Sequence, residues 1–163
     1  MCGIDIRPLI SSDKRWLTDF LITHWGSAMM VSRGRLFDVS THCGWVAEND
    51  QKEVMGLITY EHLVDESREI TCLESRTETQ GIGSRLLQAV IDQARAEKWP
   101  RLWLITTNDN LNALRFYQKR GFVLKALYPN ALEISRCLKP EIPIIGLNNI
   151  TIRDEIELEY LLT

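Results

Sequence analysis

The amino-acid sequence predicts a single α/β domain built on a mixed, largely antiparallel β-sheet that is flanked by helices. Several short segments alternate apolar and polar residues with the period of a β-strand. One strand-like segment, Arg68–Glu74, is followed by a strongly amphipathic helix and then by a second apolar strand. The chain has 163 residues, which are enough to form one hydrophobic core and too few for two domains of typical size. We therefore expect residues 1–163 to form one domain.

The N-terminal segments predict an edge strand and a helix. Residues 4–7 alternate and stop at Pro8, which is typical of an edge strand. Ser11 or Ser12 then provides an N-cap for a helix whose apolar stripe ends near Gly26.

Residues 27–60 predict an irregular connection followed by a β-hairpin. Between Ser27 and His42 the hydrophobic periodicity fades, so we expect a connection that could line a substrate site. Residues 44–47 and 54–60 are rich in β-forming side chains and flank a short polar turn, which favours an antiparallel hairpin.

The central strand is expected at Arg68–Glu74, because β-forming residues occupy both of its faces as in an interior strand. Strict alternation would place Glu69 on one face and Glu74 on the other. The strand at Leu102–Thr106 should run parallel to it, since a strand, a helix and a strand in that order form a right-handed crossover.

A turn with two glycines joins the central strand to the amphipathic helix. This glycine turn, Gln80–Arg85, reads QGIGSR. Gly81 and Gly83 allow the backbone to turn tightly and to approach a ligand closely. The helix that follows offers unpaired N–H groups and a partial positive charge, so the turn is a candidate phosphate-binding site.

The C-terminal part predicts two short helices and two strands. Asn110 caps a helix that stops at Gly121, and Phe122–Leu127 is strand-like. Asn130 caps a short helix over Ala131–Leu138. In the last segment, apolar residues alternate strictly with glutamates, so we interpret it as a half-buried strand with a solvated acidic face formed by Glu155, Glu157 and Glu159.

Composition and charge argue against binding to nucleic acid or membranes and against a cysteine-based metal or redox site. The formal net charge of −3 gives no excess of positive charge that would favour binding to nucleic acid or to an anionic membrane. No apolar run is long enough to span a membrane, and no export signal is visible, so we expect a cytoplasmic protein. The four cysteines are far apart and form no metal or redox motif. A small molecule is therefore the expected partner.

A second motif lies one crossover after the glycine turn. It reads Asn110-x-x-Ala113-x-x-Phe116-Tyr117-x-x-x-Gly121-Phe122. Together the two motifs resemble the GNAT superfamily of acyl-CoA-dependent N-acyltransferases, whose N-x-x-A-x-x-F-Y-x-x-x-G-F pattern is matched at every fixed position. The order of the elements is also similar over nearly the whole chain. The resemblance implies a central pair of parallel strands that splay apart.

The resemblance also implies a cofactor and a reaction. The expected cofactor is acetyl-CoA, with CoA as product, and acetyl passes directly to a primary amine without a metal or a covalent enzyme intermediate. In the splayed pair, main-chain groups of Leu73 and Ser75 would bind the pantetheine arm. The full implied cofactor-binding set is Leu73, Ser75, Gln80, Gly81, Ile82, Gly83, Ser84, Arg85, Asn110, Ala113, Phe116 and Tyr117.

Two residues are the implied catalysts. Tyr117 would donate a proton to the departing thiolate of CoA. An amine substrate arrives as an ammonium ion and must lose a proton before it attacks. Glu69 is the preferred base, because the family often places a glutamate before an apolar stretch of this strand. Glu74 and an ordered chain of water molecules remain alternatives.

One position departs from the family. The family usually has Gln or Arg three residues before the first glycine, and this chain has Glu78. A carboxylate that faced the pyrophosphate would repel it, so we expect Glu78 to point away and Gln80 and Arg85 to supply donors.

Other functions are less well supported. A dinucleotide-binding unit would need a third glycine where Leu86 stands and an acidic residue near Trp103. A non-catalytic module that binds a CoA thioester or a protein remains open, as does the identity of the acceptor amine. The alternating final strand suggests a possible homodimer.

Overall fold

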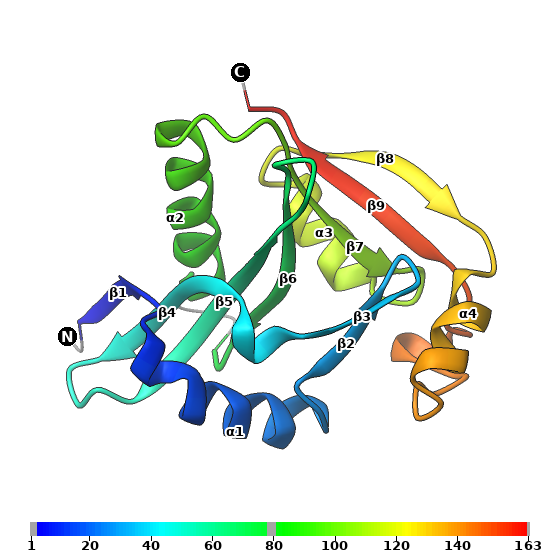
Figure 1. Ribbon diagram of the computed structural model, residues 1–163, viewed down its shortest axis with the longest axis horizontal. Coiled ribbons are helices and arrows are strands. Elements are labelled where there is room, and N and C mark those ends of the chain that lie inside the picture. Colours follow the sequence, from blue (N-terminus) through cyan, green and yellow to red (C-terminus); the bar gives the residue numbers. More distant parts are fainter. Residues whose placement is uncertain (1–2, 78–80, 163) are drawn as a thin grey trace.

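The computed structural model describes residues 3–77 and 81–162 and contains a seven-stranded sheet in the order β1-β4-β5-β6-β7-β9-β8 (Figure 1). Its strands are β1 (Ile4–Pro8), β4 (Cys43–Asn49), β5 (Val54–His62), β6 (Arg68–Ser75), β7 (Leu102–Thr107), β8 (Phe122–Tyr128) and β9 (Glu155–Tyr160). The helices are α1 (Lys14–Trp25), α2 (Ile82–Ala96), α3 (Leu111–Gln118) and α4 (Ala131–Leu138). None of the described helices is long and apolar enough to cross a membrane. The predicted mixed, mostly antiparallel α/β fold is confirmed.

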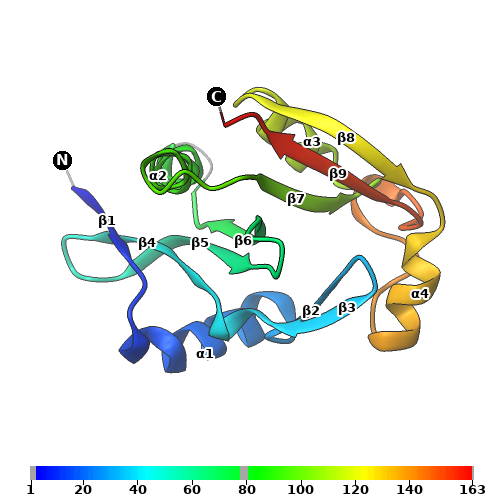
Figure 2. The ribbon, with the colours of Figure 1, turned by 45° about the horizontal axis from the view of Figure 1, so that its top comes forward.

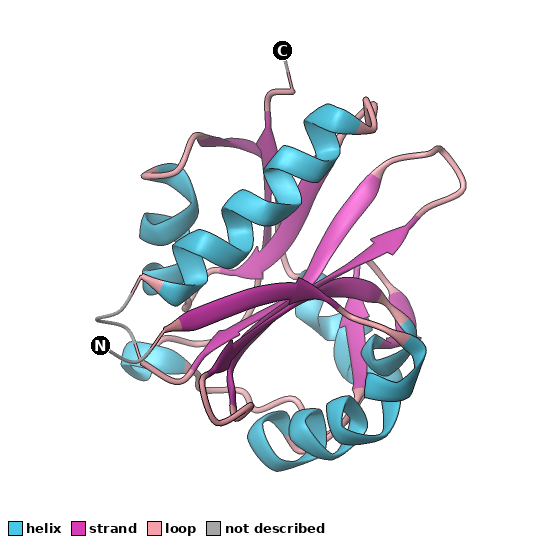
Figure 3. Ribbon diagram, turned by 90° about the vertical axis from the view of Figure 1, so that its left-hand side faces the viewer, coloured by secondary structure: helices cyan, strands magenta, loops and turns pink. Residues whose placement is uncertain are grey.

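Helices cover both faces of the sheet (Figure 2). Apolar side chains of α2 pack on Ile58, Ile70 and Leu104, and we call this side the α2 face. On the opposite side, the α1 face, Leu17 and Leu21 of α1 pack on strands β5 and β6. Figure 3 shows the sheet between α2, in the upper half of the view, and α1, in the lower half.

The parallel strands β6 and β7 pair over only part of their length. Their register is Arg68 with Leu102, Glu69 with Trp103 and Ile70 with Leu104. Both strands continue for several residues beyond this pairing, so they diverge toward their carboxyl ends, as Figure 1 shows. The backbone edges that face each other beyond Ile70 are therefore left without a strand partner in the described pairing.

A β-bulge in β6 changes which residues share a face. Thr59 pairs with Cys72 and the next residue, Tyr60, pairs with Ile70, so Thr71 is an extra residue on β6. A bulge makes two residues oppose one and resets the alternation after it.

The reset overturns the predicted separation of Glu69 and Glu74. Ile70 and Leu73 both pack against the core of the α2 face, whereas Cys72 packs beneath α1. Glu69 contacts Ser32, which precedes it by 37 positions, and Glu74 contacts Trp25 of α1. The two glutamates therefore lie on the same face of the sheet, and the strict alternation assumed from the sequence was wrong.

The connection expected to be irregular between Ser27 and His42 contains a β-hairpin. Strand β2 (Met29–Ser32) pairs with β3 (Arg35–Asp38), and a 3-10 turn follows at Val39–Thr41. The turn residues Arg33 and Gly34 have φ of 51° and 70°, as a two-residue hairpin turn requires. A positive φ is uncommon for arginine, and for this reason the sequence carries no standard turn signal.

The last strand is an interior strand. Strand β9 pairs with β7 on one side and with β8 on the other, so it cannot pair with a second chain at a dimer interface. Glu155 is 2% exposed and Glu157 is 6% exposed. Their predicted role as a solvated face is wrong, because Arg33 pairs with Glu155, and Arg101 and Tyr128 bind Glu157.

Helix ends match the sequence in part. Ser11 and Ser12 belong to a 3-10 turn before α1 rather than to its cap, whereas the C-cap is Gly26 with φ of 77°. Asn110 caps α3 through a 3.1 Å hydrogen bond from the backbone N–H of Ala113. Asn130 precedes α4 but makes no side-chain cap. The Asn110 cap fixes the start of α3, and α3 carries the candidate site residue Tyr117.

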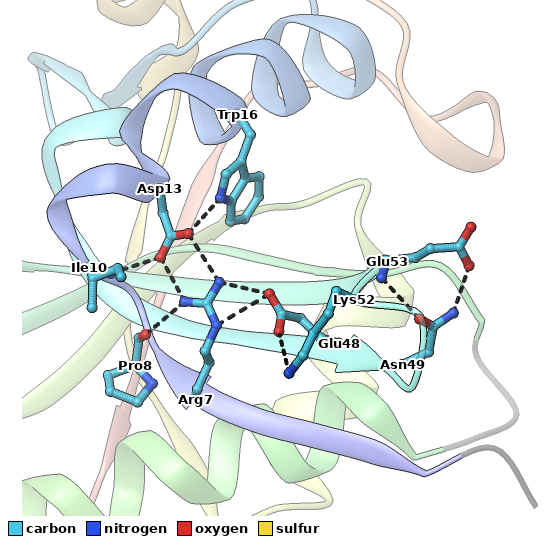
Figure 4. Close-up of polar contacts among 9 residues, drawn as sticks. All are labelled: Arg7, Pro8, Ile10, Asp13, Trp16, Glu48, Asn49, Lys52 and Glu53. Carbon is cyan, nitrogen blue, oxygen red and sulfur yellow. Dashed lines mark hydrogen bonds and ion pairs between the residues drawn. The ribbon is translucent and has the colours of Figure 1, made fainter.

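The outer strands are tied to α1 by an ion-pair network around Arg7 (Figure 4). The guanidinium donates to Asp13 at 2.7 Å and to Glu48 at 2.7 Å, and Trp16 donates to Asp13 at 2.7 Å. The hydrogen bond from Arg7 lowers the pKa of Asp13 to about 2. Asp13 therefore stays ionised at neutral pH and holds the start of α1 against the edge of the sheet.

Candidate active site

A cleft of about 740 Å³ opens where β6 and β7 diverge. Its walls come from both strands, from the start of α2, from α3 and from Trp25 at the end of α1. We call it the central cleft. From the predicted cofactor-binding set it is lined by Leu73, Ser75, Gly81, Gly83, Ser84, Asn110, Ala113, Phe116 and Tyr117.

The central cleft is bounded by residues from both faces of the sheet. Ile70 and Leu73 belong to the core of the α2 face. Cys72 packs beneath α1, and Glu74 accepts a 2.8 Å hydrogen bond from the indole N–H of Trp25 in α1. The cleft therefore passes between the two strands, and two reactants that approach from opposite faces can meet inside it.

The glycine turn forms one end of the cleft. Gly81 has φ of 65° and is the N-cap of α2, which begins at Ile82. The N–H groups of the first helical turn have no partner within the helix and point toward its N-terminal end, where an anion can accept them. A Cβ at Gly83 would lie 3.6 Å from the ring of Phe116 across the cleft. Of the two glycines, Gly81 is the one that requires the left-handed backbone.

Two predicted residues of the glycine turn, Ile82 and Arg85, do not line the cleft. Ile82 is fully buried in the core of the α2 face. Arg85 donates to the backbone oxygen of Ile4 at 3.0 Å, so its side chain is directed toward β1. Gln80 lies outside the described residues, as does Glu78. The expectation that Arg85 supplies a donor at the phosphate site is not met in this structure.

Tyr117 lies in the cleft two turns after the cap of α3. Its side chain is 7% exposed and packs edge-on against Phe116 and Phe122, each with ring centroids 5.2 Å away. Burial raises the pKa of the Tyr117 phenol well above its ordinary value. The hydroxyl is therefore protonated at neutral pH and can donate a proton inside the cleft.

Glu69 is buried beside the cleft rather than in its wall. It is 1% exposed, and it accepts hydrogen bonds from the Ser32 hydroxyl at 2.5 Å and from Arg35 at 2.7 Å. Both donors come from the β2–β3 hairpin. Burial raises the pKa of the Glu69 carboxyl above its ordinary value. Glu74, by contrast, is among the residues that line the cleft.

The family assignment rests on comparison with known proteins. Residues 13–122, more than half of the chain, match the model of the Acetyltransferase (GNAT) family. The chain belongs to the GNAT acetyltransferase family. A relative from Bacillus subtilis strain 168, the uncharacterized protein YdhI, is 46% identical over 143 residues, which are 88% of this chain and 89% of that protein.

Solved structures share the GNAT fold. A GNAT family acetyltransferase from Elizabethkingia anophelis with acetyl-CoA bound superposes with a TM-score of 0.66 at 24% identity, covering 96% of this chain and 97% of that one. A Bacillus subtilis acetyltransferase in complex with CoA gives a TM-score of 0.67 at 18% identity, with complete coverage of both chains. At these identities the likeness supports the fold.

Several cleft residues of this GNAT chain were not found from the sequence. Arg115, Lys119 and Arg120 line the cleft from α3 and the residues after it. They occupy variable positions of the second motif, so the motif gave no signal for them. Thr71 also lines the cleft, and its hydroxyl lies 2.8 Å from Nδ1 of His42. Thr71 is the extra residue of the β6 bulge, and no sequence pattern revealed its contact with His42.

No metal site is present among the residues that the structure describes, because no three His, Cys, Asp or Glu side chains lie together in a suitable arrangement.

Proposed function

We propose that this protein is an N-acetyltransferase that transfers the acetyl group of acetyl-CoA to a primary amine. The observation that carries the proposal is the central cleft, which extends from the N-terminal end of α2 to a buried tyrosine between diverging strands. Membership of the GNAT acetyltransferase family and the related structures with acetyl-CoA or CoA bound support it.

The cofactor would bind along the length of the central cleft. Its pyrophosphate would accept hydrogen bonds from the first-turn N–H groups of α2, near Gly83 and Ser84. Its pantetheine arm would run along the edge of β6 that β7 leaves unpaired, with main-chain contacts at Leu73 and Ser75. The thioester would then lie deeper in the cleft, near Tyr117.

The acceptor would enter from the α1 face. Its neutral amine attacks the thioester carbonyl carbon, a C–N bond forms and the C–S bond breaks. The attacking nitrogen must lose a proton, and Glu69 is the proposed base. Because Glu69 does not line the cleft, it would act through a bridging water. Glu74, in the cleft wall, is the alternative. Tyr117 would give its proton to the departing thiolate.

A panel of amines mixed with acetyl-CoA tests the proposal. Peptides with lysine or a free N-terminus, polyamines, aminoglycosides and amino acids would each be added to the purified protein. Release of free CoA thiol and the mass of the acetylated amine would be measured. We expect one amine class to raise thiol release far above the rate of acetyl-CoA hydrolysis. If calorimetry shows CoA binding while no amine is acetylated, a non-catalytic CoA-binding module is the better description.

A further inference from the structure

Arg120, which follows α3, places a cation beside the glycine turn. Its guanidinium donates to the Ser84 hydroxyl at 3.0 and 2.6 Å and to the backbone oxygen of Phe116 at 2.9 Å. The guanidinium carbon lies 3.6 Å from the centroid of the Phe116 ring. That same ring lies 3.6 Å from the Cβ position of Gly83. Arg120 is therefore next to the start of α2, and it lines the central cleft.

This charge lies between two helix ends of opposite sign, because Arg120 follows the C-terminus of α3, which attracts a cation, and contacts the start of α2. The N-terminus of a helix carries a partial positive charge, so a cation there is repelled by the helix dipole. The partners of Arg120 among the described residues are a neutral hydroxyl and a neutral carbonyl. An anion bound between the start of α2 and the Arg120 guanidinium would be attracted by both and would offset their mutual repulsion.

Arg120 also has the donors that an anion needs. A guanidinium has five N–H groups. The bonds to Ser84 and Phe116 use one N–H on each of its three nitrogens, which leaves one N–H on each terminal nitrogen. N–H groups of a guanidinium are strong donors to phosphate oxygens, and the contact of the guanidinium carbon with the Phe116 ring helps to position them.

We propose that Arg120 binds the pyrophosphate of the cofactor and supplies the side-chain charge that Arg85, directed toward β1, does not bring to the glycine turn. The proposal rests on the proposed function, because it takes the ligand to be acetyl-CoA or CoA. The family's usual Gln or Arg ahead of the turn is replaced here by Glu78. In this chain the positive charge comes instead from the opposite wall of the cleft, after α3.

Calorimetric titration with three ligands tests the assignment. CoA has the pyrophosphate and a 3′-phosphate, dephospho-CoA has the pyrophosphate alone, and pantetheine has no phosphate. We expect Arg120→Gln to weaken CoA and dephospho-CoA alike, by roughly 10- to 100-fold, because charge-assisted hydrogen bonds are lost. Pantetheine, followed by NMR because it binds weakly, should be unaffected.

Two further variants control the experiment. Lys98→Gln removes one positive charge at the far, exposed end of α2, and it should change CoA affinity by less than about twofold. Arg120→Lys keeps the charge but loses the planar fork, so it should weaken CoA by roughly 3- to 10-fold. This variant also serves if Arg120→Gln does not fold.

Each contrary result has a distinct meaning. Unchanged CoA affinity in Arg120→Gln overturns the proposal, and so does an equal loss for pantetheine, which would mark a structural role. A loss for CoA but not for dephospho-CoA would assign Arg120 to the 3′-phosphate instead. If the wild-type protein binds no CoA at all, the proposed function fails and this proposal fails with it.

Discussion

At the scale of single residues, the hydroxyl of Tyr117 is the group with the clearest chemical task. The ring is fixed by its packing against two other aromatic residues, so Tyr117→Phe removes the hydroxyl and little else. A thiol with a pKa near ~8.5 leaves fairly well without protonation. We therefore expect kcat to fall by about 10- to 100-fold, the lower part of the range for a general acid.

The affinity for acetyl-CoA separates chemistry from packing at this position. It should stay within about twofold of the wild-type value, because the lost interaction is made only in the transition state. Steady-state kinetics with the best amine and calorimetry with acetyl-CoA measure the two quantities. Wild-type turnover in Tyr117→Phe, under conditions where chemistry limits the rate, would leave Tyr117 as a packing residue.

The second residue-scale prediction concerns the base. Burial raises the pKa of Glu69 in the direction of neutral pH. A general base works best when its pKa lies near the working pH. Glu69→Gln should lower kcat/KM at pH 7 by about 10²- to 10⁴-fold. Its activity should rise as the pH approaches the amine pKa near ~10, since the neutral amine then forms without a base.

Glu74→Gln is the matched variant, because it removes the same charge from the same strand and face. If Glu69 is the base, Glu74→Gln keeps the wild-type pH profile and loses little activity. The reverse pattern would move the role of base to Glu74. An unchanged profile in both variants would favour a chain of water molecules.

At the scale of elements, the sequence predicted the strands and helices that carry the motifs and missed what depends on distant partners. The bulge at Thr71 was invisible, because Thr71 and Cys72 are small β-formers that suit either face of a strand. Glu157 looked solvated because its partner Arg101 is more than 50 positions away along the chain. Arg120 occupies a variable motif position, so its contact with Ser84 needed the three-dimensional structure.

The glycine turn gives a prediction at this scale, because its two glycines have different tasks. Gly81 has a positive φ and nothing within 4 Å of its Cβ position. Gly81→Ala should therefore cost about 1 kcal/mol of folding stability through backbone strain and leave cofactor affinity nearly intact. Gly83 has no positive φ, so a side chain at that position causes no left-handed backbone strain.

Gly83→Val should show the opposite behaviour. Its side chain would project toward Phe116 into the space above the first-turn N–H groups, where the pyrophosphate would lie. We expect acetyl-CoA affinity to fall by at least about tenfold, as the phosphate loses its charge-assisted contacts. Thermal unfolding and calorimetry of both variants check the pair. Equal affinity of Gly83→Val and wild type, with both folded, would contradict this placement of the pyrophosphate.

At the scale of the whole molecule, the sheet behaves as two half-sheets joined at one end. Strands β1, β4, β5 and β6 form one half, and β7, β9 and β8 form the other. The pairs from Arg68 to Ile70 in β6 are the described β-pairing that connects the halves. The parallel direction of β6 and β7 was predicted from the sequence alone by the rule that such crossovers are right-handed. The extent of the splay needed the observed register.

A cofactor in the central cleft would act as an extra strand between the two halves. It would satisfy backbone groups of β6 beyond Ile70 and join the half-sheets along the rest of their length. At a CoA concentration about 100 times its Kd, binding should stabilise the fold by about 2.7 kcal/mol. For a domain of this size, that corresponds to a rise in Tm of about 5–10 °C.

Hydrogen exchange can show whether this stabilisation is local to the cleft. Amides of β6 from Cys72 to Ser75 should exchange much more slowly with CoA bound than any general stabilisation explains, because opening them would also break their contacts with the ligand. The β1–β4 pair at the outer edge is the internal control, since it lies three strand pairings from β7. Its amides should slow only where they exchange through global unfolding. Uniform slowing throughout the sheet, without excess protection in β6, would mean that CoA does not bind along the edge where the two half-sheets separate.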